Sequence, residues 1–213
     1  MSKISKKIMW ILTILSYAGI LICYPRLPER IPIHWNIRWE IDNWGSKNHL
    51  LFIGLLPVVI LITFDSIVKY RHGEVNNKHF KVYQLLKAAV ILLLILLNWM
   101  TVVIALGVPV KASVVMPVFL GIFFIVLGNY MPALKSNYFM GIRNPWTLSD
   151  EFVWRKTHKA GGFLFILLGL LMFLMSFVQN TGINMIILAL LLISAAGINI
   201  YSYLIYRKRG KNT

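Results

Sequence analysis

The chain has 213 residues, of which 58% are apolar and 14% are charged, whereas soluble domains carry about 25% charged residues. This composition excludes an ordinary soluble domain. The formal net charge of +15 comes from basic residues that lie between apolar runs, a pattern that indicates membrane orientation rather than direct nucleic-acid binding.

Six apolar runs approach the ~20 helical residues that a hydrocarbon core of ~30 Å requires. They lie at residues 8–24, 50–68, 85–106, 113–131, 161–178 and 184–206. Because strands in lipid must close into a barrel, we predict an all-α integral membrane protein with six transmembrane helices. Two junctions, residues 107–112 and 179–183, leave other interpretations open: one long kinked helix or a re-entrant pair in place of two spans.

The first run begins with basic residues and ends at Cys23, the single cysteine of the chain. A lipoprotein signal requires a small residue before its cysteine, and Ile22 is not small. Residues 16–18 match a signal-peptidase site poorly, and the apolar run continues beyond them. We therefore expect an uncleaved first helix and no intrachain disulfide bond.

Lysine and arginine are divided unequally between alternate loops. The N-terminus, residues 69–87, residues 132–160 and the C-terminal tail together contain 17 of the 22 basic residues. The remaining 5 lie in residues 25–49 and 107–112. Because cytoplasmic loops carry the excess of Lys and Arg, both termini are predicted to be cytoplasmic, with 25–49 an outer loop and 132–160 an inner loop.

The outer loop is expected to leave the membrane in an extended, polyproline-like conformation. Its prolines at positions 25, 28 and 32 are too close together for a helix. Asp42-Asn43 and Gly45-Ser46 have the composition of turns.

The outer loop also contains tryptophan at positions 35, 39 and 44. Two interpretations stay open, because Trp is both a common anchor in protein interfaces and a common residue at the membrane surface. His34, Asp42 and His49 are possible metal ligands, but their spacing matches no zinc pattern, so no metal is expected.

The inner loop begins with Pro132, which ends the fourth apolar run. Thr147 and Asp150 have the spacing of a capping box. A short helix is therefore predicted to begin near Leu148 and to lead into the fifth span.

Arg143 lies in a predicted tight turn formed by Gly141, Asn144 and Pro145. Aromatic residues surround it in the sequence, namely Tyr130, Tyr138, Phe139 and Trp146. An orientation signal needs none of them. Two interpretations remain open: packing of the loop under the helices, and direct contact with a partner.

Several polar residues fall within or beside the spans. Asp65 precedes Lys69 by four residues, which favours an ion pair on one helix face. Lys87 is expected to extend its side chain to the inner surface. Three further residues are expected to hydrogen-bond between helices: Asn98, Thr101 and Asn199.

Motifs for catalysis or ion transport are absent from the sequence. No span carries a pair of carboxylates or a ladder of charges, so an ion pathway is poorly supported. The sequence contains no HExxH, no GxSxG and no glycine-rich phosphate loop. We therefore expect neither an enzyme nor a cofactor.

Both loops resemble known sequence patterns. The inner segment resembles the signature of the SdpI family through GNYMP at 128–132, NYF at 137–139, GIR at 141–143, PWTL at 145–148 and VW at 153–154. The outer segment is similar to a domain of unknown function that often precedes it, through LP at 27–28, IPIH at 31–34, Asn36, Asp42 and WGSK at 44–47. Where that outer pattern usually has glycine, this chain has Trp39.

The resemblance implies two sequence domains. Residues 1–68 would form a helix pair with the outer loop, and residues 69–213 a four-helix region with the inner loop. It also implies a bacterial plasma-membrane protein that gives immunity to a secreted, sporulation-delaying peptide toxin. The family's founding member also holds a small DNA-binding autorepressor at the membrane, so the lipid bilayer, the toxin and such a repressor are the expected partners.

The candidate contact residues lie in both loops. They are His34, Asn36, Asp42, Trp44, Asn137, Arg143, Pro145, Trp146 and Trp154. A small membrane transporter or permease is the alternative function, although it would need a polar site near the midplane on broken helices.

The predicted orientation can be checked by cysteine labelling in a Cys23→Ser background. We expect an impermeant thiol reagent on intact cells to label a cysteine introduced at Ser46, because the outer loop faces the medium. A cysteine at Ser136 should stay unlabelled until the cells are permeabilised. Labelling of position 136 on intact cells would contradict the topology.

Overall fold

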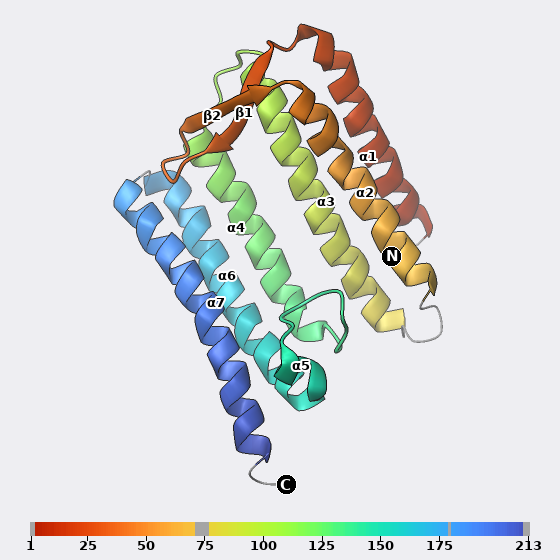
Figure 1. The fold of residues 1–213 in the computed structure, drawn as a ribbon, viewed down its shortest axis with the longest axis vertical. Helices are drawn as coiled ribbons and strands as arrows, with labels where there is room; N and C mark the ends of the chain where they lie inside the picture. Colours follow the sequence, from red (N-terminus) through yellow and green to blue (C-terminus); the bar gives the residue numbers. More distant parts are fainter. Residues whose placement is uncertain (1–2, 71–76, 179, 211–213) are drawn as a thin grey trace. The chain divides into compact units, whose positions relative to one another are not determined.

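The computed structural model describes residues 3–70, 77–178 and 180–210, with side chains for 6–66, 81–178 and 180–210. Six of its helices are long and apolar enough to cross a membrane (Figure 1). They are Lys3–Cys23 (α1), Asn48–Tyr70 (α2), Asn77–Ala105 (α3), Ala112–Tyr130 (α4), Glu151–Val178 (α6) and Thr181–Gly210 (α7). The predicted all-α membrane fold with six spans is confirmed, and the side on which the termini lie stays a prediction.

Two compact units make up the chain, residues 1–116 and 117–213. In the first unit α1, α2 and α3 pack against one another, so α3 belongs with the N-terminal helices by packing. The second unit contains most of α4 together with α6, α7 and the short helix Pro145–Ser149 (α5). The sequence domains 1–68 and 69–213 remain a prediction, because they describe where sequence patterns begin rather than which helices touch.

Side-chain hydrogen bonds tie the helices of the first unit together. The Trp99 indole donates to Ser16 Oγ at 2.9 Å, joining α3 to α1. The Asn98 amide donates to the Ile53 carbonyl at 3.4 Å, joining α3 to α2 as the sequence predicted. The same prediction for Thr101 is wrong, because its hydroxyl bonds to a carbonyl one turn earlier on its own helix.

A charge cluster that includes the buried Lys87 joins α1, α2 and α3. One carboxylate oxygen of Asp65 lies 2.9 Å from Lys87 Nζ, and the other lies 3.1 Å from both Lys6 Nζ and the Trp10 indole nitrogen. The Lys87 side chain is 1% exposed, so the expectation that it reaches the membrane surface is wrong. The attraction of a carboxylate within the protein outweighs the access to water. The expected partner Lys69 has a side chain outside the described residues.

Glycine lets α4 and α6 approach each other backbone to backbone in the second unit. A Cβ atom added at Gly128 would lie 2.5 Å from the Gly162 carbonyl oxygen, and one at Gly162 would lie 2.6 Å from the Gly128 oxygen. The pair Gly121 and Gly169 repeats this reciprocal contact seven residues away on each helix. The two helices therefore run antiparallel, with small residues at their interface as is common in membranes.

The helices α6 and α7 have 28 and 30 residues, which at 1.5 Å per residue gives about 42 and 45 Å. A hydrocarbon core is about 30 Å thick, so both helices extend well beyond it. The short helix α5 packs against both of them. The start of α6, the end of α7 and α5 thus lie together at one end of the second unit (Figure 1).

The glycine contact predicts a sharp difference between two valine substitutions. Gly128→Val should destabilise the protein by at least the ~1–3 kcal/mol typical of overpacking, because the group it would strike is backbone that cannot rotate away. Gly197→Val serves as the control, since a Cβ added at Gly197 meets nothing within 4 Å. Abundance in the membrane and thermal stability in detergent measure the effect; equal behaviour of the two variants would refute the close approach.

Candidate functional site

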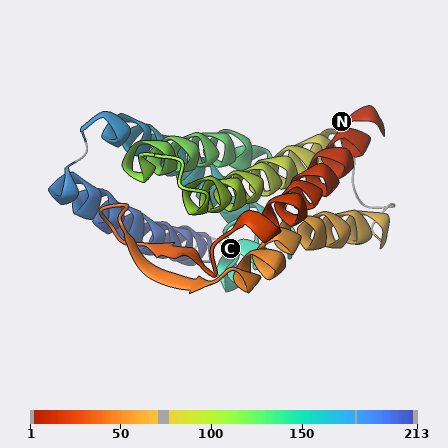
Figure 2. The same cartoon turned by 90° about the horizontal axis from the view of Figure 1, so that it is seen from above.

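The outer loop folds as a β-hairpin of two antiparallel strands, Arg30–Trp35 (β1) and Ile41–Ser46 (β2), which run side by side (Figure 2). The expectation of a polyproline-like loop is wrong. The two dipeptides assigned to turns, at 42–43 and 45–46, lie within β2. Burial of Ile31 against Ile20, Leu50 and Val102 stabilises the strand face and outweighs the local preference of the prolines.

The register explains how Pro32 fits into a strand. The Lys47 N–H donates to the Glu29 carbonyl at 3.0 Å, which makes this facing pair a hydrogen-bonded one. Such pairs alternate in an antiparallel ladder, so the pair Pro32 and Trp44 is not hydrogen-bonded. Pro32 therefore loses no ladder bond, and the backbone groups of Trp44 and Ser46 point away from β1.

Side chains of β1 and α2 hydrogen-bond to the carbonyls of β2 that point away from β1. The Arg30 guanidinium donates to the Trp44 carbonyl at 3.0 Å, and His49 Nδ1 lies 2.8 Å from the Ser46 carbonyl. On the opposite edge Pro32 has no N–H to offer. Both edges are thus poor templates for a further strand, and recognition by this hairpin should use side chains.

Asn36 holds the turn between the strands. Its side-chain oxygen accepts from the N–H groups of Arg38 at 2.8 Å and Glu40 at 3.1 Å. Trp39, which stands where the outer pattern usually has glycine, adopts a φ of +63°. A left-handed conformation costs a residue with a side chain roughly 1–2 kcal/mol, which explains the usual glycine. Asn36 is therefore a structural residue of the turn.

Three candidate residues stay accessible on the outward face of the hairpin. His34 Nδ1 lies 2.6 Å from Asp42 Oδ1 across the two strands, and both side chains are exposed. Trp44 is 44% exposed although it is large and apolar. Among the residues that the structure describes, no three His, Cys, Asp or Glu side chains come together as metal ligands.

Asn137 organises the first part of the inner loop. Its amide donates to the carbonyls of Lys135 and Met140, and its oxygen accepts from the N–H groups of Phe139 and Met140. The four distances lie between 2.8 and 3.1 Å. These bonds use the whole side chain, so Asn137 fixes the loop rather than meeting a partner.

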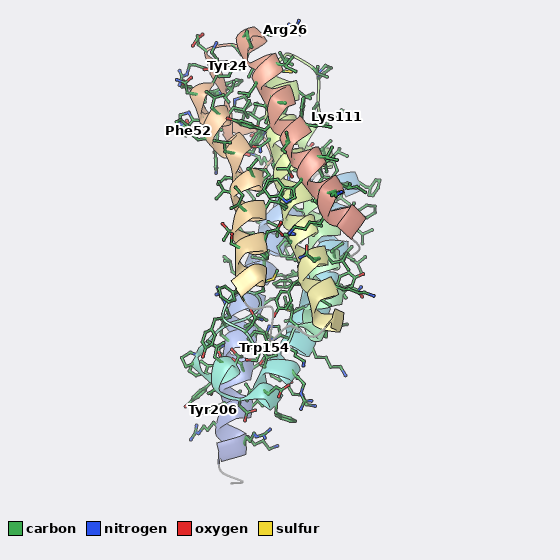
Figure 3. The ribbon with its side chains drawn as sticks, turned by 90° about the vertical axis from the view of Figure 1, so that its right-hand side faces the viewer. Tyr24, Arg26, Phe52, Lys111, Trp154 and Tyr206 are labelled. Carbon is green, nitrogen blue, oxygen red and sulfur yellow. The ribbon has the colours of Figure 1, made fainter. Side chains whose placement is uncertain are left out.

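His158 and Trp154 of α6 support the loop from below. The Ile142 N–H donates to His158 Nε2 at 3.0 Å, so the histidine is neutral and its Nδ1 donates to the Trp154 carbonyl. The two rings stack, and Gly141 at a φ of +104° leaves room for the histidine. Trp154 lies in the first turn of α6 (Figure 3). It is fully buried, and its indole donates to the Leu134 carbonyl. Its burial gives it a supporting role, and no partner can contact it directly.

The capping of α5 differs from the sequence expectation. Asn144 is the N-cap and Thr147 closes the reciprocal box, so the helix begins at Pro145 and not near Leu148. Asp150 instead caps α6, accepting from the N–H groups two and three residues later. Proline favours the first position of a helix, which selects the earlier start.

Arg143 is exposed, and its guanidinium donates to the Tyr138 carbonyl. None of the ion pairs among the described residues involves Arg143. Tyr138 and Phe139 beside it are 65% and 45% exposed. Pro145 is also exposed, whereas Trp146 turns its ring toward Tyr203 of α7 at 5.2 Å.

The sequence analysis did not predict the contacts between the inner loop and α7. Ser202, Tyr203 and Arg209 all bond or pack against it, although nothing in their spacing indicates this. Asn199 was expected to bond between helices. It accepts from Asn144 of the loop at 3.1 Å and donates to a carbonyl of its own helix.

Comparisons with known proteins match both halves of the chain. The model of the SdpI/YfhL protein family matches residues 133–202, and that of a domain of unknown function, DUF1648, matches residues 11–61. The immunity protein SdpI of Bacillus subtilis (strain 168) is 30% identical over 203 residues, covering 93% of this chain and 94% of the relative. No solved structure matches the chain.

Proposed function

The chain belongs to the SdpI/YfhL protein family, and from this we propose that it protects a bacterial cell against a secreted peptide toxin by binding it. It is a multi-pass protein of the cell membrane. The observation that carries the proposal is the likeness to an immunity protein along 93% of the chain.

The outward face of the hairpin is the proposed toxin site. It combines an exposed apolar ring, Trp44, with the polar pair His34 and Asp42. Exposed aromatic residues on a rigid scaffold are frequent anchors of binding energy. The hairpin is anchored to the helices through the buried Ile31, and its turn is held by Asn36. Protection by binding needs no reaction, so the toxin itself would remain chemically unchanged.

The inner loop is the proposed site for a cytoplasmic partner, such as a small DNA-binding repressor held at the membrane. Support comes from Arg143, whose exposed guanidinium keeps donors beyond the one that binds the Tyr138 carbonyl. A carboxylate of the partner could accept two parallel bonds from it. The neighbouring Tyr138 and Phe139 offer exposed apolar surface.

A small transporter is the weaker candidate. It would need broken helices and a polar site near the midplane. Both prolines inside spans, Pro57 and Pro117, lie in helices that continue through them. The polar side chains Asn98 and Thr101 are engaged in hydrogen bonds that hold helices together or stay within one helix.

Substitution of the exposed tryptophan tests the toxin site. In a sensitive strain that expresses the protein and is challenged with the sporulation-delaying toxin, Trp44→Ala should reduce protection on the order of tenfold, the loss of one anchor. Phe52→Ala is the control, because Phe52 is 73% exposed on the apolar helix α2. Mass spectrometry should find the peptide intact after exposure to protected cells. Specific cleavage products would indicate an enzyme instead.

Exchange of arginine for lysine tests the inner site. Arg143→Lys should insert normally, because orientation follows summed charge, yet lose capture of the cytoplasmic partner, because lysine cannot make two parallel bonds to a carboxylate. Lys135→Arg, on the same loop and also exposed, should have no effect. Membrane localisation of the repressor measures capture; full capture by Arg143→Lys would show that this arginine serves orientation alone.

A further inference from the structure

A hydrogen-bond cluster centred on Ser202 fastens the inner loop to α7. The Asn144 amide donates to Ser202 Oγ at 2.8 Å, and the Trp146 indole N–H donates to the same oxygen. Ser202 Oγ donates in turn to the Asn199 carbonyl, 2.7 Å away. Ser202 is fully buried. We refer to Asn144, Trp146, Asn199 and Ser202 as the α7 clamp.

The hydroxyl of Ser202 is used to its full capacity. A hydroxyl group has one donor and two acceptor sites, and here both acceptor sites and the donor are occupied. Loss of this oxygen would leave the part-buried Trp146 N–H without its acceptor, which is more costly than the loss of an exposed bond. The Asn144 amide would keep its second bond, to Asn199 Oδ1.

Apart from the clamp, α7 packs along α6 but buries few of its side chains. Its buried residues within the described chain are Ile187, Ile198 and Ser202, so the half that starts at Thr181 buries a single residue. Apolar contacts between helices gain little in lipid, because lipid tails are as apolar as the side chains. The specific attachment of α7 is therefore concentrated at the clamp end.

An ion pair near the α7 clamp also joins the end of α7 to the inner loop. Arg209 Nε pairs with Asp150 Oδ2 at 2.9 Å, and Asp150 also caps the first turn of α6. The Arg209 guanidinium lies 4.9 Å from the centre of the Phe152 ring. The end of α7 thus contacts both the α5 segment and the start of α6.

We infer that α7 sets the conformation of the inner loop, with Ser202 as the positioning residue. Arg143 directly precedes Asn144, so a clamp that fixes Asn144 also fixes the backbone from which the exposed guanidinium extends. Displacement of α7 would release this segment and with it the geometry of Arg143. The functional meaning of the clamp rests on the proposed partner site, whereas its structural effect does not.

Trypsin can report on the clamp through a bond that the protein already contains. Cleavage between Arg143 and Asn144 requires the loop to open, and its rate follows the population of the open form. In full-length protein in detergent, Ser202→Ala should accelerate this cleavage at least tenfold. Ser202→Thr, which keeps the hydroxyl, should remain near the wild-type rate. Fragment masses distinguish this bond from other tryptic sites.

Two further variants distinguish opening of the loop from unfolding of the whole protein. Ser194→Ala, two turns earlier on α7, should cleave like wild type. Trp146→Phe removes one donor and leaves Ser202 in place, so it should give a smaller acceleration in a folded protein. An unchanged cleavage rate in both Ser202→Ala and Trp146→Phe overturns the inference.

The functional readout separates the clamp from the partner site. Ser202→Ala should lose capture of the cytoplasmic partner and keep protection against the toxin, because the hairpin belongs to the other compact unit. Faster cleavage together with full capture by Arg143→Lys would leave the clamp standing and remove the partner site. Loss of protection in Ser202→Ala at normal abundance would contradict the separation.

Discussion

Within each compact unit, the helices are held by contacts other than the hydrophobic effect. In lipid, apolar side chains gain little by meeting one another, so helix association depends on close backbone packing and on polar bonds. One unit uses a charge cluster in which Asp65 accepts from three groups on two neighbouring helices. The other uses reciprocal glycine contacts between α4 and α6. The loops extend from helices whose positions these contacts fix, and their geometry depends on them.

The sequence predicts the helices well and the loops poorly, for a physical reason. A span needs about twenty apolar residues in a row, and no competing structure satisfies its backbone in lipid. The conformation of a loop depends on small differences in free energy between competing local structures. Both Asn144 and Thr147 are good caps, and the choice between them rests on Pro145. The outer prolines favour an extended loop until burial of Ile31, which no local pattern reveals, pairs the strands.

Residues of the two sequence patterns divide into those that build a loop and those that it presents. The side chains of Asn36, Asn137 and Trp154 hydrogen-bond to the backbone of their own loop. His34, Trp44 and Arg143 stay exposed on the loops that these bonds hold in place. The type of residue cannot make this distinction, since asparagine, tryptophan and arginine are all common contact residues. Hydrogen-bond partners and burial decide it.

The family match in the second unit begins and ends at meaningful places in the structure. It starts at residue 133, where the chain leaves α4 for the inner loop, and it stops at residue 202, the centre of the α7 clamp. The matched segment therefore contains the loop and both sides of its attachment. The other match, residues 11–61, contains the hairpin and helix segments on either side of it. Each match thus contains one loop with the helix segments on either side of it, although α3, which also packs against the hairpin, lies outside the first match.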